Sequence, residues 1–162
     1  MSKTIVVYGS STGTCESIAQ TIASKLGAEV IAVSDLTAEQ LAEADNILLG
    51  SSTWGAGELQ DDWYDGIEIV KKADLSGKKV AVFGCGDSAS YSDTFCSAMK
   101  ELYDAAQEAG ATLVGAVSTD GYEFDDSDAV VDGHFVGLAL DDVNEDGKTE
   151  ERIDAWIPTL GL

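Results

Sequence analysis

Short apolar runs alternate with amphipathic segments along most of the chain. Near-continuous runs of aliphatic and β-branched residues are typical of strands that are buried on both faces of a parallel sheet. The runs lie at residues 4–8, 29–33, 46–51, 79–83 and 112–117. Helices joining such strands cover both faces of the sheet, so the alternation predicts a doubly wound α/β sandwich.

Helical periodicity appears between these runs, with apolar residues three and four positions apart. The four segments contain Ile18, Ala19, Ile22, Ala23 and Leu26; residues 60–72; Phe95, Met99, Leu102 and Ala106; and Ile153, Trp156, Ile157 and Leu160. Thr37 and Gln40 have capping-box spacing, which predicts a brief additional turn of helix. Trp63 and Trp156 lie on apolar helix faces, and we expect both in the core.

Residues 118–134 interrupt the alternation with a polar, acidic stretch, before apolar residues resume at 135–140. This stretch is too long for an ordinary connection, so we predict an insertion at or within the last strand. No repeat or linker divides the chain. With 162 residues and 44% apolar content it is expected to form a single domain, residues 1–162, with a full core.

The charge balance is strongly acidic, with 30 acidic and 9 basic residues and a net charge of −21. Such a field repels nucleic acid and anionic membranes and attracts basic protein surfaces. Acidity alone names no partner, and a saline habitat favours the same excess. No apolar run approaches the ~20 residues of a membrane span, and the N-terminus lacks a signal-peptide pattern. We therefore expect a soluble cytoplasmic protein.

Several familiar sites are excluded by their motifs. The three cysteines form no C-x-x-C pair, which argues against disulfides and zinc and suits a reducing compartment. Gly9 and Gly13 have the wrong spacing for a P-loop, and no Lys follows them. Residues 142–147 resemble the start of a calcium loop, but Ile153 stands where its bidentate Glu belongs. His134, the only histidine, is expected at the surface and not as a base.

Ligands of doubly wound sheets bind beyond the carboxyl ends of the strands, where strand order reverses. Three loops are therefore expected to meet, at residues 9–15, 51–60 and 84–91. The first contains hydroxyls and glycines, and no Lys or Arg lies between Lys3 and Lys25. A helix start favours anions, so this loop is a candidate phosphate site built from neutral donors. The alternative is a turn whose Ser and Thr residues only cap the helix.

The second and third loops carry aromatic residues. Trp54 precedes Gly55 in a glycine-rich stretch, and Tyr91 lies in a second Gly/Ser-rich stretch. An indole and a phenol ring on such loops suit the two faces of a flat ligand. The alternatives are an indole packed over the sheet edge and a solvent-exposed tyrosine. Taken with the phosphate loop, these residues describe a site for flavin mononucleotide (FMN).

At this point the sequence resembles the flavodoxins, small FMN-binding electron carriers. The motifs that match are Ser10, Thr12 and Gly13 of the phosphate loop; Ser52-Thr53-Trp54-Gly55 and Glu58-Leu59-Gln60; Gly86-Asp87 followed by Tyr91; and residues 121–127 and 135–141 of the long-chain subgroup's extra loop. The likeness covers essentially the whole chain. It departs at Cys15, where the family has Thr, and a thiol is a weaker donor than a hydroxyl.

The resemblance implies a five-stranded parallel sheet of order 2-1-3-4-5 and a low-potential one-electron carrier that shuttles between flavin semiquinone and hydroquinone. It implies no substrate chemistry and a monomer. The implied cofactor-binding residues are Ser10, Ser11, Thr12, Gly13, Thr14, Cys15, Ser52, Thr53, Trp54, Gly55, Ala56, Cys85, Gly86, Asp87, Tyr91, Asp93, Phe95 and Cys96. No catalytic or metal-binding residues are expected.

The resemblance also assigns roles within this set. The Gly55 carbonyl would accept a hydrogen bond from the protonated flavin N5 after a peptide flip, and glycine allows the positive φ that this needs. Partners implied by the family are redox proteins with basic docking faces, such as ferredoxin/flavodoxin-NADP reductases, photosystem I and nitrogenase. Two other functions stay open: an FMN-dependent quinone or flavin reductase, and a cofactor-free signalling or interaction domain on the same fold.

Overall fold

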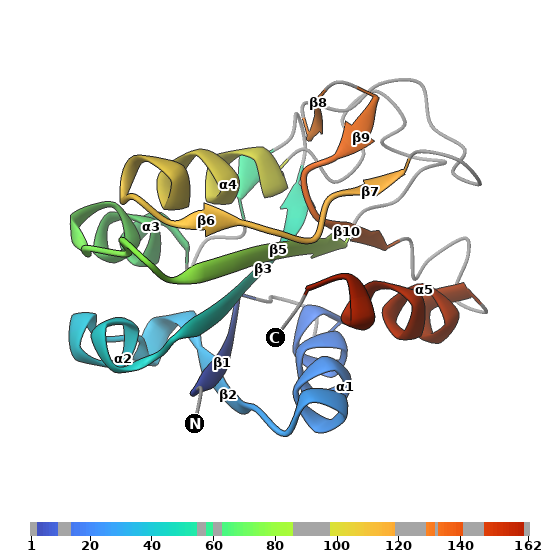
Figure 1. Cartoon of the computed structure of the whole chain (residues 1–162), viewed down its shortest axis with the longest axis horizontal. Helices are drawn as coiled ribbons and strands as arrows, with labels where there is room; N and C mark the ends of the chain where they lie inside the picture. The colour runs from blue at the N-terminus through green and yellow to red at the C-terminus, as the bar shows by residue number, and fades with distance from the viewer. Residues whose placement is uncertain are drawn as a thin grey trace.

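A computed structural model describes residues 3–9, 14–54, 58–59, 63–85, 98–118, 129–131, 133–140 and 148–160. The remaining residues, and the predictions that fall on them, lie outside the described part of the chain. Two clusters of buried side chains flank a central sheet, with helices on each side (Figure 1).

The central sheet is parallel along its main path, in the order β10-β5-β3-β1-β2. Its strands are β1 (Thr4–Gly9), β2 (Glu29–Ala32), β3 (Asn46–Trp54), β5 (Lys79–Cys85) and β10 (Leu138–Leu140). Counted in chain order, these five strands have the expected order 2-1-3-4-5, and the predicted doubly wound fold is confirmed.

The edge of the sheet beside β5 is shared by two short strands. β6 (Thr112–Leu113) pairs with the start of β5, and β10 pairs with its end. The fifth strand predicted at 112–117 is therefore shorter than expected. The chain leaves the sheet because Gly115 has φ +88°, and the Trp156 indole donates to its carbonyl at 2.8 Å.

Between β6 and β10 the chain forms a second, antiparallel sheet in the order β7-β9-β8. Its strands are β7 (Val117–Ser118), β8 (Val130–Val131) and β9 (His134–Phe135). Phe135 is fully buried in the main core, while His134 is exposed, as expected. That residues 118–134 are an insertion into the fold stays a prediction.

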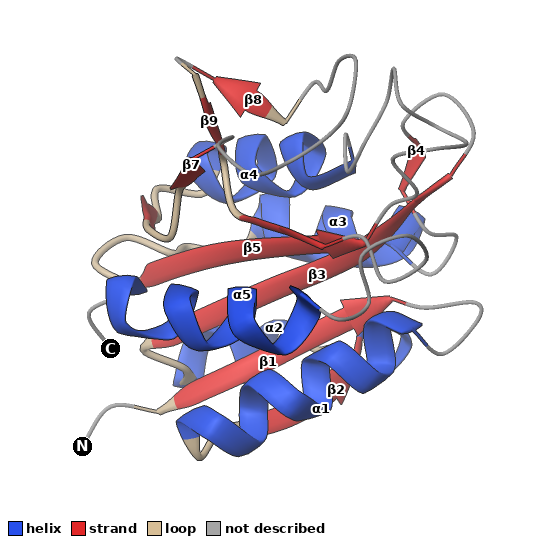
Figure 2. Ribbon diagram, turned by 90° about the vertical axis from the view of Figure 1, so that its right-hand side faces the viewer, coloured by secondary structure: helices blue, strands red, loops and turns tan. Residues whose placement is uncertain are grey.

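Helices cover both faces of the central sheet (Figure 2). On one face lie α1 (Thr14–Leu26) and α5 (Thr149–Trp156), and α5 continues as a 3₁₀ turn (Ile157–Leu160). On the other lie α2 (Ala38–Glu43), α3 (Trp63–Lys72) and α4 (Ala98–Glu108), with a 3₁₀ turn at Val33–Asp35. No helix in the described ranges combines the length and apolar character needed to cross a membrane.

Alternation along the strands builds the two cores. Ile5 and Val7 point to the cluster under α2, α3 and α4, whereas Val6 between them points to the cluster under α1 and α5. Side chains of a strand alternate between faces, so each apolar run supplies both cores. Trp63 lies in the first cluster and Trp156 in the second, both buried as predicted.

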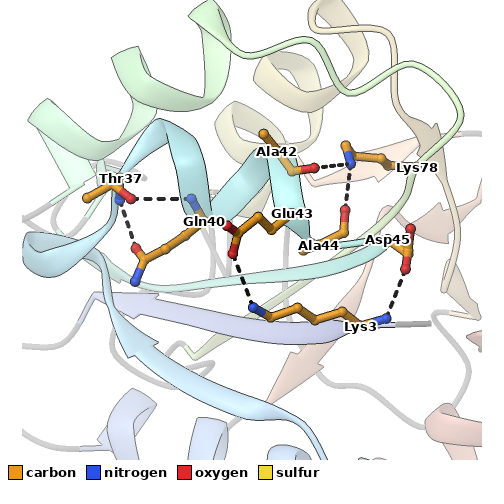
Figure 3. A network of polar contacts seen from close by, with 8 residues as sticks. All are labelled: Lys3, Thr37, Gln40, Ala42, Glu43, Ala44, Asp45 and Lys78. Atoms are coloured by element: carbon orange, nitrogen blue, oxygen red, sulfur yellow. Dashed lines mark hydrogen bonds and ion pairs between the residues drawn. The ribbon is translucent and has the colours of Figure 1, made fainter. Parts of the chain in front are cut away.

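Short polar contacts hold α2 at the amino-terminal end of the sheet (Figure 3). The predicted capping box is present, with the Gln40 amide donating to the Thr37 hydroxyl at 3.3 Å and the Thr37 amide donating to the Gln40 side chain at 2.9 Å. At the other end of α2, Lys78 Nζ donates to the carbonyls of Ala42 and Ala44 at 2.9 and 2.6 Å. These carbonyls lack helical partners, so Lys78 acts as a C-terminal cap.

The same network reaches the start of β1. The Lys3 amide donates to the Asp45 carboxylate at 2.9 Å, and Lys3 Nζ lies 3.5 Å from the Glu43 carboxylate (Figure 3). Lys3 precedes β1 and Asp45 precedes β3, so this contact fixes the amino-terminal end of the sheet. The three predicted loops begin at the opposite end of the sheet, where β1, β3 and β5 end.

Candidate functional site

The predicted loops start from one row of residues at the carboxyl end of the sheet. Gly9 of β1 is in register with Ser51 of β3, Ser51 with Gly84 of β5, and Gly84 with Ala139 of β10. The carboxyl ends of β1 and β5 therefore lie on either side of β3 (Figure 2). The structure brings together the starting points of the three loops that the sequence singled out.

The first segment joins β1 to α1. Ser10, Ser11, Thr12 and Gly13 lie outside the described residues, while Thr14 and Cys15 begin α1, with side chains that are not described. In a β-strand followed by a helix, the first turn of the helix lies at the strand's carboxyl end. Its unpaired N–H groups thus face the same edge as Gly9, which suits an anion.

Tyr8 lies half-buried just before the end of β1. Burial raises the pKa of its phenol, and the Glu16 and Asp35 carboxylates raise that pKa further. Deprotonation would add a third negative charge beside two carboxylates, so the phenol stays neutral at physiological pH. Tyr8 therefore adds no negative charge at the edge where α1 begins.

The second segment is a β-hairpin. β3 continues beyond the sheet and pairs with the antiparallel strand β4 (Glu58–Leu59), with Thr53 opposite Leu59 and Trp54 opposite Glu58. Residues 55–57, Gly-Ala-Gly, connect the two strands and lie outside the described residues. Sequence reasoning treated this stretch as a polar loop. The signal it missed is a glycine-rich triplet between two residue pairs that can form a ladder.

The base of this hairpin is held by Trp63, the first residue of α3. Its indole Nε1 donates to the Gly50 carbonyl at 2.7 Å, and the side chain is fully buried. Sequence reasoning placed Trp63 in the core but assigned it no polar role. Ser52, Thr53 and Trp54 belong to β3, and their side chains are not described.

The third segment follows Cys85, the last residue of β5, whose side chain is not described. The predicted ligand residues beyond it lie outside the described part of the chain: Gly86, Asp87, Tyr91, Asp93, Phe95 and Cys96. Just before this segment, α4 packs closely on β5 at Gly84. An added Cβ at Gly84 would lie 2.6 Å from Met99 Cγ.

The described part of this edge suits an anionic group and a close approach of the backbone to a ligand. It combines a helix N-terminus preceded by hydroxyl residues with a hairpin whose connection contains two glycines. Glycine lets a backbone approach a ligand closely. Among the described residues, no group of three or more His, Cys, Asp or Glu side chains is placed to hold a metal ion.

Comparison with known proteins places the chain among flavodoxins. The family model described as "Flavodoxin" matches residues 6–156. Flavodoxin 1 of Azotobacter vinelandii is 42% identical over 167 aligned residues, covering 99% of this chain and 96% of that protein. Flavodoxin 1 of Escherichia coli K12 is 41% identical, covering 99% of this chain and 93% of that protein.

A solved structure shows the same architecture. The crystal structure of Fusobacterium nucleatum flavodoxin bound to flavin mononucleotide superposes with a TM-score of 0.91. It is 29% identical and covers 98% of this chain and 96% of that one. The similarity thus extends over nearly the full length of both molecules.

Proposed function

The chain belongs to the flavodoxin family, and we propose that FMN binds at the edge marked by Gly9, Ser51 and Gly84. The protein is a one-electron carrier, and bound FMN supplies the redox chemistry. The observation that supports this site best is the register that places the three strand ends in one row. Those strands precede the three family motifs, and α1 starts beside them.

The chain's own residues are proposed to divide the work. Hydroxyls of Ser10, Ser11, Thr12 and Thr14 would hold the phosphate, with the amides of Gly13 and Cys15 and the weaker thiol donor of Cys15. Two aromatic residues, Trp54 and Tyr91, would cover the faces of the ring and exclude water. The remaining proposed contacts are Ser52, Thr53, Gly55, Ala56, Cys85, Gly86, Asp87, Asp93, Phe95 and Cys96.

A reductive titration of purified protein tests this function. We expect yellow protein that develops a long-wavelength absorption band of one-electron-reduced flavin before it is bleached. Direct two-electron bleaching with turnover of a quinone would support the reductase alternative. Colourless protein that does not bind added FMN would contradict the assignment and favour a cofactor-free domain.

We also propose that the protein has no substrate chemistry of its own and acts through basic redox partners, as the family implies. Segments 86–97, 119–128 and 141–147 contain acidic residues and no Lys or Arg. Added salt should therefore slow electron transfer to a basic partner, because it screens the attraction. A rate that does not change with salt would contradict this.

The single domain, long-chain type, monomeric state and reducing cytoplasmic location are proposed on sequence grounds.

Cys15 gives a separate prediction for FMN affinity. A Cys15→Thr variant should bind FMN about two- to fivefold more tightly, because a hydroxyl donates a better hydrogen bond than a thiol. Titrating FMN into both apoproteins measures the difference, and Cys15→Ser is the control that also restores a hydroxyl. Tighter binding by the native protein would show that the thiol is not a weakened phosphate contact.

A further inference from the structure

One buried hydrogen bond joins the two ends of the β3–β4 hairpin. Gly50 lies four residues before Trp54, and Trp63 lies four residues after Leu59. The 2.7 Å bond from Trp63 Nε1 to the Gly50 carbonyl therefore links the entry to the hairpin with its exit. Removing the donor would leave a buried carbonyl with a desolvation penalty that this hydrogen bond no longer offsets, so loss of the bond is destabilising.

The carbonyl's position is fixed from the opposite face of the sheet as well. Phe83 is in register with Gly50, and its ring occupies the space of a Gly50 side chain, with Cζ 2.1 Å from the position of an added Cβ. Phe83 belongs to the core under α1 and α5, whereas Trp63 belongs to the core under α2, α3 and α4. β3 is thus held between two aromatic rings immediately before the hairpin.

The indole that donates the bond is itself fixed. Gly66 lies one turn further along α3, and a Cβ there would lie 2.2 Å from Val33 Cγ2 and 3.2 Å from Trp63 Cε3. Val33 therefore packs into the space that Gly66 leaves beside the indole. Packing on this side restricts the Trp63 side chain to one rotamer, so its N–H is already oriented toward the Gly50 carbonyl.

We propose that Trp63 is a positioning residue for the cofactor. Its N–H holds Gly50, and the paired strands β3 and β4 are thereby fixed beside the proposed FMN site. The inference rests on the proposed FMN site. Without the bond, the hairpin gains freedom that FMN must remove on binding, so affinity falls.

The chain offers a matched pair of variants to test this. Trp156 is also a buried tryptophan whose Nε1 donates to a glycine carbonyl, Gly115, at 2.8 Å, but it lies in the other core. Trp63→Phe and Trp156→Phe each remove one indole N–H and the same volume. We expect both to lower the urea midpoint, and only Trp63→Phe to weaken FMN binding, on the order of tenfold.

Amide hydrogen exchange of the apoproteins gives a reading that needs no cofactor. Trp63→Phe should speed exchange of the Thr53 to Leu59 hairpin amides on the order of tenfold, and Trp156→Phe should leave it unchanged. If wild type fails to bind FMN, the proposed function fails, while the exchange result still reports on the hydrogen bond.

Three results would overturn the proposal: Trp63→Phe with wild-type affinity and exchange, faster exchange with unchanged affinity, or equal losses of affinity in both variants. Should Trp63→Phe not fold, benzothienylalanine at position 63 replaces the ring N–H by sulfur while keeping the bicyclic shape. It gives the same comparison and is judged by the same outcomes.

Discussion

The Gly137→Ala variant is expected to lose a large part of the protein's stability or to fail to fold. Gly137 is buried where the chain re-enters the central sheet, and an added Cβ would lie 1.9 Å from the Val82 carbonyl oxygen. That oxygen belongs to β5, which is held between β3 and β10. We expect a cost of about 4 kcal/mol or more, against a total of roughly 5–15 kcal/mol for a typical domain.

Urea denaturation followed by far-ultraviolet circular dichroism measures this loss. Gly27→Ala is the control, because Gly27 has φ +68° but nothing within 4 Å of an added Cβ. It should cost only about 1–2 kcal/mol, the strain of a left-handed backbone. Equal midpoints for the two variants would show that the overlap with Val82 is relieved at little cost.

The main sheet was predictable because its signal is local. Each apolar run alternates its side chains between two faces, so Val6 and Leu48 enter one core while Val7 and Leu49 enter the other. Burial on both faces is the physical reason that such runs are continuous, and it identifies parallel strands without knowledge of their partners. The capping box at Thr37 was equally local, with both partners within one turn.

The split edge of the sheet was not predictable in the same way. Residues 112–117 read as one apolar strand, yet the chain turns at Gly115 because Trp156 and Leu160 of the C-terminal segment pack against it. An added Cβ at Gly115 would lie 2.7 Å from Leu160 Cδ2. A residue more than forty positions away thus decides where this strand ends, and no local pattern reports it.

For the site, the sequence predicted which segments begin at the same edge of the sheet, but not the structure within them. The ladder between Trp54 and Glu58 depends on pairing beyond the sheet, and the Trp63 bond depends on how α3 docks. Both involve hydrogen bonds of backbone groups, and the pattern of apolar side chains contains no information about these bonds. The individual ligand residues stay predictions, including Asp87 and Tyr91, which lie outside the described residues.

The Gly55→Val variant is expected to bring the two one-electron reduction potentials of the bound cofactor closer together. Gly55 directly follows Trp54, the last paired residue of β3. Its carbonyl is proposed to accept a hydrogen bond from an N–H group of the reduced ring after a peptide flip, which uses a φ that a β-branched residue resists. A penalty of about 1.4 kcal/mol on the one-electron-reduced state lowers the first reduction potential by about 59 mV and raises the second by the same amount. The separation between the two potentials therefore narrows by about 120 mV.

Spectroelectrochemistry of the FMN-loaded proteins measures both potentials. Gly57→Val is the matched control, because it adds the same side chain to the same three-residue connection without altering the proposed acceptor. It should leave the separation close to wild type even if FMN affinity falls. A Gly55→Val protein with unchanged separation would exclude the flip, and equal narrowing in both variants would attribute the effect to distortion of the hairpin connection.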